Sequence, residues 1–264
     1  MYYYNIHSGS GNRLYLQRKK YGFFSLHSFF CRSILFSKAN TSRLAVACRH
    51  HGVTVQAALQ TASAIALCRL LRNPNLSTNI NALPHSLPLH IGCSVDMRNF
   101  YSQIPKGAVR CYVSMKDTEL NVSWDSEFWQ VAQENKRQIH SNPQESISDF
   151  LKQLELDQKI GSGMPKSLPS PPNYGCYPGL RMCHSNLGNC SILELDDTAS
   201  VRINGMVVTC SMHCFGPIFD HYAMTILDQL NLNIVHFPNI HSPDVVDYFV
   251  SETQRILFDA MGET

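Results

Sequence analysis

Apolar positions are densest in residues 54–71, and their arrangement predicts a buried helix. Thr54 stands where an N-cap is expected, because its hydroxyl can accept a hydrogen bond from an unpaired first-turn amide. Nearly every later position is apolar or small, so the helix lacks a broad polar face for water. A membrane span needs about 20 mainly apolar residues, and Gln and Thr interrupt this shorter run. We therefore predict a core helix that is covered on more than one side.

Weaker patterns on both sides of this run predict alternating helices and strands. Further helices are expected at 41–51, at 124–140 with Ser123 or Ser126 as cap, at 147–154, and from Pro243 onward. Apolar alternation or short apolar runs predict strands at 34–36, 89–97, 108–115, 181–186, 190–195, 201–203, 206–210, 222–227 and 230–237. The expected hairpin turns are Asn204-Gly205 and Asp228-Gln229. This order indicates a mixed α/β fold, a two-layer sandwich with helices on a mixed β-sheet.

Charge divides the chain unevenly. The first acidic residue is Asp96; ten Lys/Arg residues precede it, whereas twelve Lys/Arg and twenty Asp/Glu residues lie from Asp96 onward. We interpret residues 1–33 as an irregular basic segment and residues 34–264 as the folded domain, with a long loop at 161–178. The basic start has three interpretations: a mitochondrial targeting segment, a contact for an anionic partner, or an atypical or truncated beginning. We expect a cytoplasmic protein, with mitochondria as the alternative.

The ten cysteines do not form a recognisable metal or disulfide pattern. No Cys-x-x-Cys pair occurs and no signal peptide precedes them, so a disulfide framework is not favoured. The nearest approach to a zinc set is Cys176, Cys183 and Cys190, with Cys210, His213 and Cys214 further on. Because several cysteines lie in strand-like runs, we interpret them as small packed hydrophobes and expect no metal site.

A series of motifs resembles a known family through order and spacing, although no single motif is specific. The series is Thr41-Ser-Arg-Leu44, Cys48-Arg-His-His-Gly-Val-Thr-Val-Gln-Ala-Ala-Leu59, Ser94-Val-Asp-Met-Arg98, Tyr112-Val-Ser114 and Ser185-Asn-Leu-Gly188, followed by a hairpin and a helix. It resembles the C-terminal lobe of the condensation-domain-like, or chloramphenicol-acetyltransferase-like, acyltransferases. Alcohol acetyltransferases and polyketide-associated acyltransferases belong to that superfamily. The resemblance covers roughly residues 34–258.

The resemblance implies two similar lobes with a substrate tunnel between them. Coenzyme A or a carrier-protein thioester enters from one face, and an alcohol or amine acceptor enters from the other. The family's general base is a histidine of a His-His-x-x-x-Asp-Gly motif in the N-terminal lobe. Here the only adjacent pair, His50-His51, has Val55 and Gln56 where the motif needs Asp and Gly. We therefore expect this pair to be structural, the N-terminal lobe to be missing, and no catalytic residue in this chain.

The resemblance leaves a substrate-binding candidate, Ser185, Asn186 and Gly188, on a strand that lies near the tunnel in the family. A hydroxyl or amide there can stabilise an oxyanion; the alternative is a strand end with a glycine turn. Arg98 either pairs with Asp96, which we favour, or binds coenzyme A phosphates. A triad of Asp220, His221 and Ser211 is disfavoured, because no nucleophile elbow is present.

We accordingly predict an acyltransferase-family lobe, from a lineage that moves an acyl group from a thioester to a hydroxyl or amine, inactive alone. The alternative is a non-catalytic binding lobe, or a fragment of a longer protein. No bound cofactor is expected; acyl-coenzyme A or an acyl-carrier thioester is the possible substrate. If an N-terminal lobe completes the chain, the thioester and a small-molecule acyl acceptor are the expected partners; association with a second copy of the chain is also expected. Neither nucleic-acid binding nor a membrane span is expected.

Overall fold

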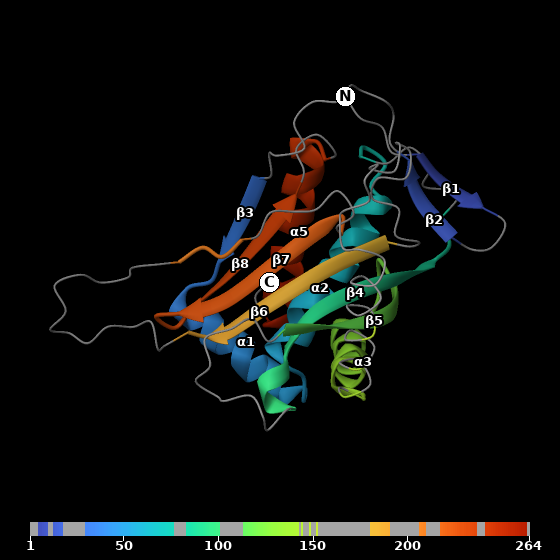
Figure 1. Cartoon of the computed structure of the whole chain (residues 1–264). Coiled ribbons are helices and arrows are strands. Elements are labelled where there is room, and N and C mark those ends of the chain that lie inside the picture. The colour runs from blue at the N-terminus through green and yellow to red at the C-terminus, as the bar shows by residue number, and fades with distance from the viewer. Residues whose placement is uncertain are drawn as a thin grey trace, which may run out of the picture.

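The computed structural model describes residues 5–9, 13–17, 30–76, 83–100, 113–142, 144, 148, 152, 180–190, 206–209, 217–236 and 241–262. A six-stranded sheet forms one layer of the fold (Figure 1). In spatial order its strands are β3 (Phe30–Leu35), β8 (Gln229–His236), β7 (Phe219–Ile226), β6 (Leu180–Asn189), β4 (Ser86–Asp96) and β5 (Val113–Ser123). β6 runs parallel to both β7 and β4, and the other neighbours are antiparallel. This arrangement confirms the predicted mixed sheet.

The helices form the second layer, and Figure 1 shows α2 and α5 behind the sheet strands. The described part of the chain contains α1 (Lys38–His50), α2 (Val55–Leu71), α3 (Phe128–His140) and α5 (Pro243–Ala260). The helix predicted at 54–71 is α2, and the Thr54 hydroxyl caps it by accepting from the amide of Ala57 at 3.2 Å. The last helix begins at Pro243 as predicted, with Ser242 as its cap.

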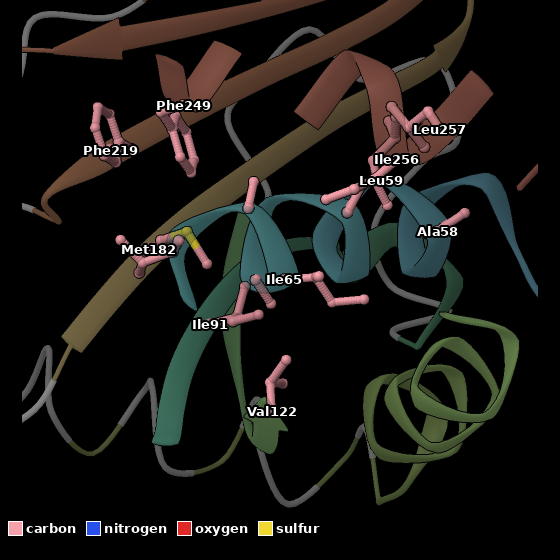
Figure 2. Packing of buried hydrophobic residues seen from close by; sticks show 14 of the residues in the cluster. Ala58, Leu59, Ile65, Ile91, Val122, Met182, Phe219, Phe249, Ile256 and Leu257 are labelled. Carbon is pink, nitrogen blue, oxygen red and sulfur yellow. The ribbon is translucent and has the colours of Figure 1, made fainter. Parts of the chain in front are cut away.

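The core lies where α2 meets the sheet and α5. In Figure 2, Ile65 of α2 points toward Ile91 of β4, and both side chains are almost completely buried. On the α5 side, the rings of Phe219 and Phe249 stack with their centroids 4.1 Å apart. The alanines of α2 are fully buried too, and their small side chains let the neighbouring elements approach closely. The nearly all-round burial of α2 confirms its predicted place in the core.

Several boundaries differ from the sequence prediction for local reasons. Helix α1 begins earlier than expected because the Ser37 hydroxyl accepts from the amide of Asn40. The predicted caps of α3, Ser123 and Ser126, are wrong: Ser123 ends β5, and Glu127 caps the helix through bonds from two first-turn amides. Strand β5 therefore extends well beyond the predicted 108–115, of which residues 108–112 lie outside the described residues.

The β7–β8 hairpin is confirmed, but its two-residue turn lies one position earlier than predicted. Ile226 pairs with Gln229, which leaves Leu227 and Asp228 as the turn residues. Both have positive φ, 50° and 62°, as a type I′ turn requires. Asp tolerates this conformation, whereas Leu rarely adopts it, and so the turn carries no Asn-Gly signature in the sequence.

The N-terminal segment contains two strands that the sequence did not predict, β1 (Asn5–Gly9) and β2 (Arg13–Gln17), paired antiparallel. The domain boundary between residues 33 and 34 stays a prediction, although β3 already begins at Phe30. Residues 206–209 are not in a strand, contrary to expectation. The structure describes only 148 and 152 of the predicted helix at 147–154, both helical, and the predictions for 161–178, 191–195 and 201–205 lie outside the described residues.

In the described part of the chain, no single helix is long and apolar enough to cross a membrane. Only α1 and α2 taken together pass such a test, and they are bent by 97° relative to each other.

Candidate functional site on the open face of the sheet

The two faces of the sheet have different surroundings because side chains alternate along each strand. Ile91 of β4 and Met182 of β6 pack into the core beneath the helices. Gly92 and Cys183 follow them in sequence and so face the other way. A Cβ atom placed on Gly92 would lie 3.6 Å from the Cys183 sulfur, which confirms their common side. Helices α2 and α5 lie on the opposite side of the sheet (Figure 1), and we call this side the open face.

A pair of hydroxyls lies on the open face where β4 and β6 run side by side. The Ser94 hydroxyl donates to the Ser185 hydroxyl at 3.0 Å, and both residues are half-buried. Their strands are in parallel register, with Cys93 opposite His184. Two hydroxyls carry two protons, and their mutual bond uses only one of them. The pair therefore retains one proton that it can donate to a third oxygen.

Polar side chains continue this line across the sheet. Successive register partners are Ser185 of β6, Tyr222 of β7, Asn233 of β8 and Ser33 of β3. The Ser33 hydroxyl donates to the side-chain oxygen of Asn233 at 2.6 Å, and the Tyr222 hydroxyl donates to Asp220 at 2.6 Å. Together with Ser94, these side chains form a polar row that runs perpendicular to the strands.

Residues 206–209 cover part of the polar row, where it crosses β7 and β8. The side-chain amide of Asn231 donates to the carbonyl of Met206 at 2.9 Å, and Val208 packs against Tyr222 and Val235. Tyr222 is only 8% exposed as a result, whereas Ser94 and Ser185 stay half-buried. Apart from Ser33, which is exposed at the β3 edge, the accessible part of the row is its serine pair.

Gly92 shapes the surface next to the serine pair. A Cβ there would lie 3.2 Å from both the Asp117 carboxylate and the terminal methyl of Met115, and close to Cys183. Contacts of that length are tighter than ordinary packing allows. The absent side chain therefore lets a carboxylate, a thioether and a thiol gather over β4, two residues from Ser94.

The other two predicted binding residues shape the end of β6. The side-chain oxygen of Asn186 accepts from the amide of Gly188 at 2.8 Å, and Gly188 has φ 72°. The register with β7 shifts between Asn186 and Asn189, so the strand bulges here. These three residues were predicted as one group, but the structure separates the Ser185 hydroxyl, on the open face, from a bulge at Asn186 and Gly188 near the end of β6. Their role in binding stays a prediction.

A stacked histidine pair lies beneath the site, on the helix-facing side. The rings of His184 and His221 are 3.8 Å apart and nearly parallel, and each residue is at most 2% exposed. The His221 ring contacts the Cys183 carbonyl through Nδ1 at 3.1 Å, whereas Nε2 of both rings has no partner in the described part of the chain. Burial lowers the pKa of His221 to about 3 and that of His184 well below its ordinary value. Both rings are therefore neutral at physiological pH, and burial separates them from any substrate.

The remaining sequence candidates lie apart from the serine pair. His50 and His51 are at the C-terminal end of α1, where the His51 ring stacks on Trp129 at 4.1 Å. Asp220 and His221 point to opposite faces, since Asp220 bonds Tyr222 on the open face; Ser211 lies outside the described residues. Arg98 pairs with Asp96 at 3.0 Å, as favoured from the sequence.

Cysteine and histidine side chains do not converge on a metal site in the described residues, where no group of three metal-binding side chains occurs. Burial raises the pKa of the Cys93 thiol to about 11 and that of Cys68 to about 12, so neither is a thiolate near neutral pH. Of the cysteines and histidine proposed as the nearest approach to a zinc set, only Cys183 and Cys190 are among the described residues.

No family model matches the sequence, and no curated protein sequence matches it either. Solved structures do match. The trichothecene 15-O-acetyltransferase from Fusarium sporotrichioides aligns with a TM-score of 0.62 at 15% identity, over 88% of this chain and 47% of that protein. The chain has the fold of one lobe of these condensation-domain-like structures.

Two further structures share this lobe. An epimerization domain of tyrocidine synthetase B aligns with a TM-score of 0.53 at 12% identity, covering 89% of this chain and 48% of that one. A condensation domain that mediates chain release from the enacyloxin polyketide synthase aligns with a TM-score of 0.50 at 11% identity. The alignment covers 88% of this chain and 41% of that one. The chain thus spans about half the length of the proteins that its fold resembles.

Both segments that meet at the site carry sequence motifs, but nothing in the order of the motifs places them together. Ser94 and Ser185 occur in separate motifs 91 residues apart. Nothing in the sequence singles out Tyr222, Asn233 or Ser33 as neighbours of the site. Alternation within each strand could have placed each residue on a face, but only the register between strands brings them into one row.

Proposed function

We propose that the chain is one lobe of an acyltransferase, equivalent to the C-terminal lobe, and that its open face binds an acyl thioester near Ser94 and Ser185. The serine pair is the observation that carries this proposal. It offers one hydroxyl proton, on a half-buried surface, from the strand that carries the motif Ser185-Asn-Leu-Gly188. The likeness to acyltransferase lobes supports the choice of substrate class.

The serines are suited to a donor role and poorly suited to a nucleophilic one. A nucleophilic serine needs an adjacent base to take its proton. In the described part of the chain, neither Ser94 nor Ser185 bonds to a histidine or a carboxylate; each bonds to the other. A hydroxyl that donates to the thioester carbonyl can stabilise the oxyanion formed when an acceptor attacks, an effect worth about 3 kcal/mol in other enzymes.

Acyl transfer also needs a base for the acceptor's proton, which typically contributes about 10² to 10⁴-fold. His184 and His221 are neutral and so have the right protonation state, but both lie in the core on the other side of the sheet. His50 and His51 lie on α1. We infer that the base comes from a second lobe, and that this chain alone binds its substrate weakly and does not turn it over.

The test is thiol release from acetyl-coenzyme A and from a longer acyl analogue, with a panel of alcohols and amines. We expect the purified chain to match the protein-free rate. Turnover well above that rate, and retained when His50 and His51 are both replaced by alanine, would show that the chain holds its own base. Turnover lost on that replacement would assign the base to the histidine pair of α1.

The proposal that the chain is a non-catalytic binding lobe shares this expectation for turnover. The two proposals predict different results for Ser185→Ala when the variant is measured in the presence of the second lobe. An acyltransferase would lose rate through kcat, because the hydroxyl acts on the transition state, whereas a binding lobe would show only weaker binding. Ser251→Ala on the surface of α5 is the matched control, since that hydroxyl donates to the Tyr248 carbonyl of its own helix.

A further inference from the structure

The two edge strands of the sheet, β5 and β3, differ in whether their outward-facing backbone groups are covered. On β5, the side-chain amide of Gln138, from α3, bonds both backbone groups of Glu119. The Glu119 N–H donates to the Gln138 side-chain oxygen at 2.9 Å, and the Gln138 side-chain nitrogen donates to the Glu119 carbonyl at 2.9 Å. One amide group thus takes the place of a neighbouring strand. Blocking of this kind keeps an edge from pairing with another chain.

The opposite edge, β3, has no such cover from the described residues. The Phe36 N–H donates to the Leu230 carbonyl at 2.9 Å, so even-numbered residues bond toward β8. Because backbone groups alternate direction in an antiparallel pair, Cys31, Ser33 and Leu35 direct theirs outward. No described strand lies on that side.

The side chains of β3 also favour pairing. Leu35 is 69% exposed and Phe30 is 50% exposed, and the strand contains neither Pro nor Lys, which natural edges use against association. Its one charged residue, Arg32, donates a hydrogen bond from its guanidinium to the Asp247 carboxylate of α5 at 3.1 Å. The guanidinium charge is thereby balanced within its own copy.

We propose that β3 pairs antiparallel with β3 of a second copy of this chain, about a two-fold axis at Ser33. Outward-directed residues must oppose outward-directed residues, so only two registers overlap most of the six-residue strand. A two-fold axis at Arg32 sets the two arginines opposite each other. An axis at Ser33 sets Ser33 opposite Ser33, Cys31 opposite Leu35, and Arg32 opposite Ile34. The second register joins the two sheets into one without opposing like charges.

The occupant is a second copy rather than another protein because the edge complements itself in that register. The same six residues supply both sides, as a two-fold interface requires. The surface is separate from the serine pair, which lies on β4 and β6, so this proposal stands or falls independently of acyl transfer.

The first test is sedimentation velocity over a wide protein concentration range. We expect a reversible dimer in the wild type. Leu35→Lys should raise its dissociation constant about tenfold or more, because each dimer loses two buried leucines and gains two edge lysines. Val46→Lys on α1 is the control; Val46 is also apolar and 53% exposed, and its replacement adds the same charge. A wild type that stays monomeric throughout overturns the proposal, as does a dimer that Leu35→Lys leaves unchanged.

The second test fixes the register. Opposed residues of a hydrogen-bonded antiparallel pair have Cα atoms about 5.5 Å apart, within the range a disulfide spans. Ser33→Cys is therefore expected to form an intermolecular disulfide under mild oxidation. Asn121→Cys, exposed on the covered edge strand β5, is the control and should form far less. Equal cross-linking of both variants, or none of Ser33→Cys while a dimer is present, rules out this register.

Discussion

Replacing His184 by phenylalanine should make the fold less sensitive to mild acid. His184 and His221 are stacked in the core, at most 2% exposed, and burial holds the pKa of each far below the ordinary value. In the unfolded chain a histidine has a pKa of about 6.5. Below that pH the unfolded state binds protons that the folded state does not, so the free energy of unfolding falls as pH falls.

The size of the effect follows from the linkage relation. Between pH 7.5 and pH 5.5, a histidine that stays neutral when folded removes about 1.4 kcal/mol of stability, and two remove about 3 kcal/mol. The loss continues toward the folded pKa, which is about 3 for His221. Many domains have a total stability of only about 5–15 kcal/mol, so this loss is readily measurable.

The assay is urea unfolding followed by circular dichroism at pH 7.5 and pH 5.5. His184→Phe keeps a ring for stacking and removes one titrating group, so its loss between the two pH values should be about 1.4 kcal/mol smaller than in the wild type. Phenylalanine fills more space, but a packing cost is present at both pH values and cancels in the difference. His50→Phe, at the exposed end of α1, is the control and should behave as wild type. Equal pH dependence in His184→Phe and wild type refutes the argument.

Three further variants test individual packing and hydrogen-bonding features of the fold. Leu59→Ala should lower the free energy of unfolding by about 2–5 kcal/mol, because it opens a cavity at a fully buried position of α2. Thr54→Ala should cost about 1 kcal/mol through the lost cap, and urea unfolding measures both. Gln138→Ala should increase aggregation, seen by light scattering, because it uncovers Glu119 on β5; Gln133→Ala on the same helix should not.

The carboxylate of Glu252, on α5, affects the stability of the fold over a lower pH range than the histidines do. Hydrogen bonds from Arg255 and then Arg69 lower the pKa of Glu252, so this group contributes stability that is present above the unfolded pKa of about 4.3 and is lost as pH falls further. Its contribution therefore stays nearly constant between pH 7.5 and pH 5.5, where the histidines act.

Local sequence patterns were sufficient to predict the parts of the fold that local physics determines. The density of small and apolar residues in 54–71 predicted α2, and Ser242-Pro243 predicted the start of α5, because caps and periodicity act within one or two turns. The turn at Leu227-Asp228 and the cap at Glu127 were missed. In both cases strand pairing or neighbouring structure overrides what the residues favour alone.

The candidate site depends on information that a single sequence does not display. Ser94 and Ser185 are brought together by parallel strand register, and residues 206–209 cover the row from a part of the chain predicted to be a strand. A triad through Asp220 and His221 was disfavoured from the sequence for lack of a nucleophile elbow, and the sheet adds a second reason, because neighbouring strand positions point to opposite faces. Register and the assignment of buried faces decide these points, and both are properties of the assembled sheet.

The proposed function depends on the binding of an acyl thioester at the open face, between β4 and β6. The most direct measurement is a titration of the isotope-labelled chain with a non-hydrolysable acyl-coenzyme A analogue, followed by amide NMR shifts. We predict saturable shifts confined to the amides around Ser94 and Ser185, weaker in Ser185→Ala and unchanged in Ser251→Ala. Shifts confined to the helical layer, or no shifts up to millimolar analogue, would contradict the claim.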